Sequence, residues 1–345
     1  MERALLAVDG GNTKTIAVLV GEEGVLLGHA RTGSSNWQTL GEEGARRALG
    51  EVLGPLLAEA DRQGRRIGAA ALGLTGCDRP RDQEVLRGIV GGLLPRGPGG
   101  ADHPEASFVV LNDAFLVLRA GTADDVGVAV SSGTGGNCVA RGPDGRRLQV
   151  GGLTTELGDG GGAGDIALRG LQAVGLARDG RGWQTVLTDL LLEVAGLERV
   201  EDLMDFAIPG PGGRDPAEDL PRIADLAPLV FEAARQGDPV CRRILEDVGQ
   251  SLGRQAIIAA HHFFRREDAF PLVLGGSVIR RGVVEDLSRA VVLETRTLFP
   301  NVRPVMLSHE PILGAVLLAR DLLDPPVPWA ADLVESLGRD LDALL

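Results

Sequence analysis

The chain has 345 residues, of which 44% are hydrophobic, so it can build the cores of roughly two globular domains. Its formal net charge at pH 7 is −13 and it contains no basic run, which argues against a nucleic-acid partner. The three cysteines lie far apart and form no CxxC pair, which argues against a structural zinc site, an iron–sulfur cluster and a disulfide framework.

The sequence predicts a cytoplasmic protein without a membrane partner. Asp9 interrupts the first apolar run too early for a signal peptide. No stretch of about 18 apolar residues is without charges, so no membrane-spanning helix is expected. The unpaired cysteines fit a reducing compartment.

The first third of the chain predicts a β-meander followed by alternating helices and strands. Short apolar runs between glycine-containing turns predict three strands, at residues 4–8, 16–20 and 25–30. Apolar spacing then predicts a helix, a strand, a helix and a strand, at residues 41–63, 67–74, 80–94 and 107–111.

The middle of the chain repeats this opening. A second meander is predicted at residues 126–131, 137–141 and 147–151, and helices are predicted at 165–175, 183–195, 220–235 and 239–264. A last strand is expected at 272–274, and a linker at 325–328 leads into a terminal helix. Both meanders carry a glycine-rich turn between their first two strands, which predicts a duplicated unit in an α/β fold.

The first of these turns, residues 9–15 with the sequence DGGNTKT, contains Lys14, which is the only lysine of the chain. Glycines let backbone N–H groups approach a phosphate closely, and Thr and Lys side chains bind phosphate oxygens. Asp9 at the strand end can hold Mg²⁺ through water. The spacing is not that of a Walker A loop, and a turn of this kind is also typical of an ordinary hairpin.

Residues 131–137, with the sequence SSGTGGN, occupy the equivalent turn of the second meander. Two such turns that face each other could clamp a polyphosphate from both sides. The pair therefore favours phosphate binding over two unrelated hairpins.

Asn112 and Asp113 follow the strand at 107–111. A carboxylate in this position can accept the proton of a substrate hydroxyl that attacks a γ-phosphate. The alternative is a common turn or helix cap.

Three more segments are candidate ligand contacts. Residues 157–165 (LGDGGGAGD) place glycines before a helix, where an anion or sugar hydroxyls can bind, although a linker has the same composition. Residues 273–278 (VLGGSV) could let a flat ring lie against the backbone, or form an ordinary strand–helix turn. Residues 34–37 (SSNW) are typical of a sugar contact, or of a buried Trp beside polar loop residues.

In this order and spacing, the segments resemble the actin-like sugar-kinase superfamily, and most closely its branch of N-acetylglucosamine kinases and BadF-type ATPases. The similarity runs from Asp9 to about Arg320. It implies an α/β fold of two ribonuclease-H-like domains with ATP and sugar in an interdomain cleft, in agreement with the duplicated meander. The expected domains are residues 1–117 plus 328–345, and residues 118–327.

The resemblance also implies roles for individual residues. Asp113 is the expected catalytic base, and Asp9 and Asp113 are expected to hold Mg²⁺. The residues expected to bind ATP are Gly10, Gly11, Asn12, Thr13, Lys14, Gly133, Thr134, Gly135, Gly275, Gly276 and Ser277. The residues expected to contact the sugar are Asn36, Trp37, Thr75, Gly76, Asn112, Asp113, Gly152 and Asp159.

Two departures from the family pattern concern the sugar. Gly136 stands where relatives commonly carry Ser, and residues 151–162 lack the Trp, His, Glu and Ser of the pattern GGWGHxxGDEGS. ATP binding is therefore better supported than specificity for N-acetylglucosamine. The expected substrate is an amino hexose such as N-acetylglucosamine or glucosamine, phosphorylated at O6.

Two other functions stay open. One is a BadF-type ATPase that energises a partner protein, but such relatives carry an iron–sulfur cluster on paired cysteines, a spacing that Cys77, Cys138 and Cys241 do not show. The other is a non-catalytic sensor, against which Asp9, Asp113 and both glycine turns argue. A homodimer is expected from the resemblance alone.

Overall fold

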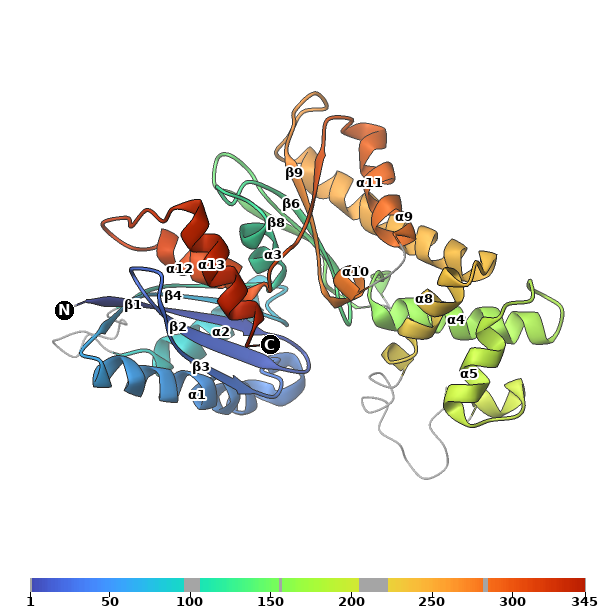
Figure 1. The fold of residues 1–345 in the computed structure, drawn as a ribbon, viewed down its shortest axis with the longest axis horizontal. Helices are drawn as coiled ribbons and strands as arrows, with labels where there is room; N and C mark the ends of the chain where they lie inside the picture. Colours follow the sequence, from blue (N-terminus) through green and yellow to red (C-terminus); the bar gives the residue numbers. More distant parts are fainter. Residues whose placement is uncertain (1, 96–105, 155–156, 205–222, 282–284, 345) are drawn as a thin grey trace. The chain divides into compact units, whose positions relative to one another are not determined.

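The computed structural model describes residues 2–95, 106–154, 157–204, 223–281 and 285–344. The chain divides into two compact units: Met1–Val126 with Leu307–Leu345, and Gly127–Met306. Each unit contains one five-stranded sheet with helices packed on it (Figure 1).

The first unit is built from five strands and five helices within its described residues. Its strands are β1 (Arg3–Gly10), β2 (Thr15–Gly21), β3 (Leu26–Thr32), β4 (Arg66–Leu74) and β5 (Ser107–Leu111). Its helices are α1 (Trp37–Arg62), α2 (Pro80–Leu93), α3 (Ala114–Ala120), α12 (Ile312–Asp321) and α13 (Ala331–Asp342).

The strand order of the first sheet is β3-β2-β1-β4-β5. The three strands of the meander are antiparallel, whereas β4 and β5 run parallel to β1. The central strand β1 reads as a continuous apolar run because helices cover both faces of the sheet. Figure 1 shows α1 and α2 on one face and α12 on the other.

The second unit begins with the second meander. Its strands are β6 (Gly127–Ser132), β7 (Gly136–Arg141), β8 (Arg147–Gly151), β9 (Pro271–Gly275) and β10 (Arg303–Met306). Its helices are α4 (Ala163–Arg178), α5 (Leu187–Ala195), the short 3₁₀ helix η2 (Val200–Leu203), α8 (Ala227–Arg235), α9 (Pro239–His261), α10 (Ser277–Arg281) and α11 (Asp286–Leu298).

The second sheet has the order β8-β7-β6-β9-β10, which repeats the order of the first sheet strand for strand. Its meander is again antiparallel, and β9 and β10 are again parallel to the first strand of the unit. The predicted duplication and the predicted α/β fold with two sheets are therefore confirmed. The interdomain cleft stays a prediction.

Several elements differ from the predicted ones. The strand at 272–274 is not the last, because β10 pairs with it; this short edge strand contains Pro304 and is largely exposed, so it gives no apolar run. The helix predicted at 220–235 is interrupted in the structure. Residues 223–224 are helical, residues 225–226 form a turn, and α8 begins at Ala227, while residues 220–222 lie outside the described residues. The helices α3, α11 and α12 have no counterpart among the predictions.

The boundaries between the two units also differ from the expected domain boundaries, 117/118 and 327/328. The chain leaves the first unit after Val126 and returns at Leu307. The second boundary lies at 306/307 because α12 belongs to the first unit. The residues of α12 are buried almost all round, since the helix packs between the sheet and α3. At Gly314, a Cβ atom would collide with the backbone of Leu116, so this packing needs a glycine.

Among the described helices, none is long and apolar enough to span a membrane.

Candidate active site

Three loops meet at one edge of the first sheet. Because β1, β4 and β5 are parallel, their carboxyl ends lie side by side, with Gly10 paired to Leu74 and Gly73 paired to Leu111. The backbone N–H of Thr75 donates to the carbonyl oxygen of Gly10 at 2.7 Å, which joins the first two loops directly. The carboxyl edge of a parallel sheet is the usual place for a ligand site in an open α/β sheet.

Asp113 lies at this edge and is held by Thr75. The Thr75 hydroxyl donates a 2.6 Å hydrogen bond to Asp113 Oδ2. Burial raises the pKa of Asp113 above its ordinary value, and the charge of Asp78 adds to this effect although the bond from Thr75 opposes it. Asn112, not Asp113, serves as the turn residue here, because its Oδ1 accepts the backbone N–H of Ala114 at 2.9 Å.

Asp9, the penultimate residue of β1, is a second carboxylate at the same edge. Burial and, after it, the charges of Asp113 and Glu310 raise its pKa to about 7, against the opposing effect of Lys14. The repulsion between the Asp9 and Asp113 carboxylates is what a divalent cation would relieve. Mg²⁺ is commonly bound by one or two carboxylates together with waters and substrate phosphates, so these residues fit it.

Within the described parts of the chain, no three His, Cys, Asp or Glu side chains form a group that could hold a metal ion without other ligands. A cation at Asp9 and Asp113 would therefore need oxygens from water or from the nucleotide.

The three cysteines are unpaired and buried. Burial raises the pKa of Cys77, the one next to this site, to about 12, so its thiol stays protonated and is no nucleophile.

The loop between β1 and β2 is a tight turn. The backbone N–H of Gly11 donates to the carbonyl oxygen of Lys14 at 2.8 Å, and Asn12 and Thr13 are exposed at the tip. The Gly10 position leaves no room for a side chain, since a Cβ atom would lie 2.6 Å from both the Leu74 and the Ser35 side chains. The exposed loop tip and the half-buried Lys14 suit the phosphate role predicted for them.

The segment 34–37 lies against the same edge. Asn36 caps α1, with its Oδ1 accepting the backbone N–H of Gln38 at 2.9 Å. Trp37 is packed partly into the core, and its indole N–H donates to the carbonyl oxygen of Gly76 at 2.9 Å. Gly76 has φ +81° and a Cβ atom there would collide with Asn36, so only glycine fits this turn.

Sequence reasoning missed two side chains in this part of the site. Asp78 accepts a 2.9 Å hydrogen bond from Asn112 Nδ2, and Gln38 donates to Asp78 Oδ2 at 3.2 Å. Asp78 stands two residues after the predicted Gly76, so the turn itself was a signal. Gln38 gives no signal, because a polar residue in the first turn of a helix is ordinary.

The predicted nucleotide residues of the second unit gather at the matching edge of its sheet. The carboxyl ends of β6 and β9 are neighbours, since Ser131 pairs with Gly275. This brings Gly133, Thr134 and Gly135, which follow β6, next to Gly276 and Ser277, which follow β9. The first turns of α4 close over the glycine turn, with Ala163 N–H donating to the Gly133 carbonyl oxygen at 2.8 Å.

Glycine is required where these segments meet. A Cβ atom at Gly136 would collide with the Gly160 carbonyl oxygen, one at Gly162 with the backbone of Gly135, and one at Gly276 with the backbone of Ser132. At Gly135 the opposite holds, since nothing lies within 4 Å of a Cβ atom and the residue is exposed. The result is a tightly packed base under an open glycine turn, a shape that fits a phosphate chain.

The two sugar residues predicted in the second unit are close to each other. Gly152 follows β8 with φ +79°, and the carboxylate of Asp159 accepts the backbone N–H of Leu153. Asp159 therefore holds the end of β8.

The structure brings the predicted residues together in two sets. The first unit holds Asp9, Gly10, Gly11, Asn12, Thr13, Lys14, Asn36, Trp37, Thr75, Gly76, Asn112 and Asp113, and the second holds Gly133, Thr134, Gly135, Gly152, Asp159, Gly275, Gly276 and Ser277.

Comparison with known proteins agrees with this geometry. Residues 6–319 match the model of the BadF/BadG/BcrA/BcrD ATPase family. The chain is 31% identical to an N-acetyl-D-glucosamine kinase of Dictyostelium discoideum, over 91% of this chain and 97% of that protein. It is 26% identical to an N-acetylmuramic acid/N-acetylglucosamine kinase of Clostridium acetobutylicum, over 93% of this chain and 99% of that protein.

A solved structure has the same fold. The crystal structure of a Chromobacterium violaceum protein, assigned as an N-acetylglucosamine kinase, superposes with a TM-score of 0.63 and 26% identity. The match covers 92% of this chain and 99% of that one. Since the family model spans most of the sequence and both units carry the glycine turns at the expected strand ends, the chain belongs to the BadF/BadG/BcrA/BcrD ATPase family.

Proposed function

We propose that this protein is an ATP-dependent sugar kinase that phosphorylates an amino hexose, such as N-acetylglucosamine or glucosamine, at O6. The observation that carries the proposal is the placement of Asp113 by Thr75, beside Asp9 and the Gly10–Lys14 turn. A base, a cation ligand and a phosphate loop are the parts that phosphoryl transfer to a hydroxyl requires. The names of the relatives support a sugar as the acceptor.

Asp113 accepts the proton of the attacking hydroxyl in this proposal. Thr75 occupies Oδ2, and we assign the other carboxylate oxygen to the substrate. The raised pKa of Asp113 makes its carboxylate a better proton acceptor than an ordinary Asp. Catalysis then rests on position and on electrostatics, with no covalent step on the protein.

Bound MgATP would supply the phosphoryl group, and its cation would neutralise phosphate charge. The residues of this chain that would hold it are Asp9 for the cation, Thr13 and Lys14 for phosphate oxygens, and the backbone N–H groups of 133–135. Gly275, Gly276 and Ser277 would receive the adenosine. Lys14, as the only lysine of the chain, would carry the one ammonium that can reach the phosphates.

The sugar would lie against Asn36, Trp37, Gly76 and Asn112 of the first unit, and we propose contacts from Gly152 and Asp159 of the second. The two sugars named for the Clostridium relative share the hydroxymethyl group at C6 and differ at O3. O6 is therefore an acceptor that suits both, which supports it for this chain.

The test is ADP release from the purified protein with ATP and Mg²⁺, over a panel of hexoses and amino sugars with a sugar-free control. The expected result is a strong increase with one or a few amino sugars, and none with the 6-deoxy analogue of the best sugar. Hydrolysis that no sugar stimulates would overturn the kinase and favour the partner-coupled ATPase.

We also propose a cytoplasmic location and a homodimer. Three buried cysteines without a disulfide fit a reducing compartment in which ATP is available.

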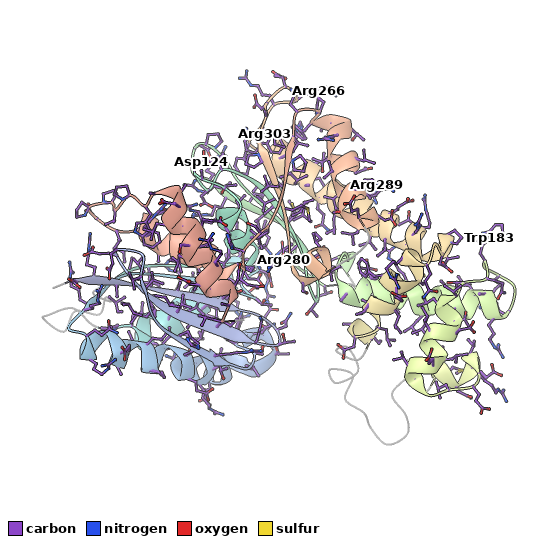
Figure 2. All side chains as sticks on the ribbon, viewed as in Figure 1. Asp124, Trp183, Arg266, Arg280, Arg289 and Arg303 are labelled. Carbon is purple, nitrogen blue, oxygen red and sulfur yellow. The ribbon has the colours of Figure 1, made fainter. Side chains whose placement is uncertain are left out.

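The proposed homodimer has a candidate surface in the second unit. This unit exposes apolar side chains around α4 and α5, among them Trp183, which is 85% exposed and lies at the periphery in Figure 2. Light scattering in solution tests the dimer, and a monomer at all concentrations would rule it out.

A further inference from the structure

Two segments of the first unit converge on one carboxylate, that of Asp78. We propose that Asp78 is a positioning residue, which holds the Asn112–Asp113 segment and the Asn36–Gln38 segment in register for phosphoryl transfer; this rests on the kinase proposed above. The carboxylate spans both, since Oδ1 accepts from Asn112 Nδ2 at 2.9 Å and Oδ2 accepts from Gln38 Nε2 at 3.2 Å.

The bond to Asn112 fixes the backbone that carries the base. Asn112 is only 3% exposed, so its amide must find partners inside the protein. Its Oδ1 accepts the N–H of Ala114 at 2.9 Å, at the start of α3, and its Nδ2 donates to Asp78. A carboxylate can only accept, so Asp78 determines which way the amide points. Asp113 lies between Asn112 and Ala114, so these bonds fix the backbone on both sides of it.

The bond to Gln38 fixes the predicted sugar segment. Gln38 Nε2 also donates to the carbonyl oxygen of Gly76 at 3.2 Å, the same oxygen that accepts the indole N–H of Trp37. The backbone N–H of Gln38 donates to Asn36 Oδ1 at 2.9 Å. Gln38, through its backbone N–H and its side chain, thus joins Asn36 to the turn that ends at Asp78, on the same Gly76 oxygen that Trp37 contacts.

The nearby Asp82 already performs the structural work expected of a carboxylate here. Its Oδ2 accepts the backbone N–H groups of Arg79 at 2.8 Å and of Asp78 at 3.3 Å, and it pairs with the Arg79 guanidinium. Asp82 is fully buried and completes the cap of α2. Asp82 Oδ2 also accepts from Gln38 Nε2 at 3.3 Å, so Gln38 contacts both carboxylates, whereas the hydrogen bond to Asn112 is made by Asp78.

The test compares Asp78→Ala and Asp78→Asn with Asp82→Asn, which weakens the α2 cap and the 3.3 Å bond from Gln38 but leaves the Asp78–Asn112 bond in place. The measurements are Tm, and kcat and KM for ATP and for the best sugar. We expect Asp78→Ala to lower kcat roughly 10- to 100-fold and to raise the sugar KM, with the ATP KM within about twofold, because a small displacement of a reacting group costs that much. Asp78→Asn keeps an oxygen that accepts from Asn112, but its amide NH₂ then faces the Gln38 donor. Its kcat is therefore expected to lie between that of Asp78→Ala and that of the wild type.

A double-mutant cycle with Gln38→Ala shows whether the bond to Gln38 carries the sugar effect. If it does, Gln38→Ala raises the sugar KM of the wild type by a larger factor than it raises that of Asp78→Ala, where only the bonds of Gln38 to Gly76 and Asp82 remain to be lost. The proposal is overturned if Asp78→Ala turns over as the wild type does, if its losses follow a fall in Tm as large as that of Asp82→Asn, or if the two substitutions add. A wild-type protein that phosphorylates no sugar would instead reject the kinase on which the proposal rests.

Discussion

Asn36 Nδ2 donates a 2.8 Å hydrogen bond to Asn12 Oδ1, which links the predicted sugar segment to the tip of the predicted phosphate loop. The two residues are 24 positions apart in the sequence and belong to different loops of one sheet edge. Because Asn36 also caps α1, one amide joins the helix, the sugar segment and the phosphate loop. Two of the five asparagines of the chain are used in this one contact.

The two roles of Asn36 can be separated by substitution. Asn36→Asp keeps an oxygen for the Gln38 N–H but has no donor for Asn12, whereas Asn36→Ala loses both bonds. We expect Asn36→Ala to lower the free energy of unfolding by about 1 kcal/mol, the usual worth of an N-cap, and Asn36→Asp to lower it by much less. Both should raise KM for the sugar in steady-state assays. Equal loss of stability in the two variants would show that the cap is not the stabilising contact.

The hydrogen bond from Thr75 to Asp113 predicts a sharp difference between two substitutions. Thr75→Val has nearly the same shape but no donor, and we expect it to lower kcat roughly 10- to 100-fold, because the carboxylate is no longer held. Thr75→Ser retains the hydroxyl and should stay within a few-fold of the wild type. Asp113→Ala sets the lower limit, with turnover reduced by several orders of magnitude while ATP still binds. A Thr75→Val enzyme with normal kcat would contradict the assigned role.

Gly136 occupies the position where relatives commonly carry Ser, and the structure predicts that the Ser is not tolerated here. A Cβ atom at 136 would collide with the backbone of Gly160 and Gly161, so Gly136→Ser should lower Tm and weaken nucleotide binding. Gly135→Ala is the matched control for stability, because it has open space and an exposed position. Thermal unfolding of both variants decides the matter; if the serine variant is as stable as the control, the close approach at Gly136 does not exist in solution.

His309 predicts a pH dependence of stability. Burial alone would lower its pKa, but hydrogen bonds of 2.8 Å to Asp342 and 3.0 Å to Glu335 outweigh this and raise the pKa above 6.5. The folded state therefore holds the proton more tightly than the unfolded state. The resulting stabilisation is fully present below about pH 6.5 and disappears as the pH rises through the folded-state pKa.

The measurement for His309 is Tm against pH for the wild type and His309→Gln. The difference between the two proteins should be largest on the acid side of pH 6.5 and should shrink toward alkaline pH. Taking the difference cancels the titration of groups that do not contact His309, including Asp9. A difference that grows with pH would contradict the assignment of Asp342 and Glu335 as partners of a protonated ring.

Nine of the ten described strands, the duplication and most residues of the candidate site were predicted from the sequence alone. Period and turn chemistry are local properties, so the two meanders and their glycine turns could be predicted from neighbouring residues. Asp9, the 10–14 turn and Asp113 were predicted because each lies in a short motif at the end of a strand. The parallel sheet then brings these strand ends together, as the register of Gly10 with Leu74 shows.

The side chains that support these motifs, and the division into two units, depend on packing between distant parts of the chain. Gln38 and Asp78 are 40 positions apart, and Asp78 and Asn112 are 34 apart, so no local pattern reports their hydrogen bonds. The helix α12 follows the second unit in sequence but packs on the first, since its apolar surface is buried against β1, β4 and α3. Hydrophobic burial has no direction along the chain, and for this reason it fixes such partners only once the sheet exists.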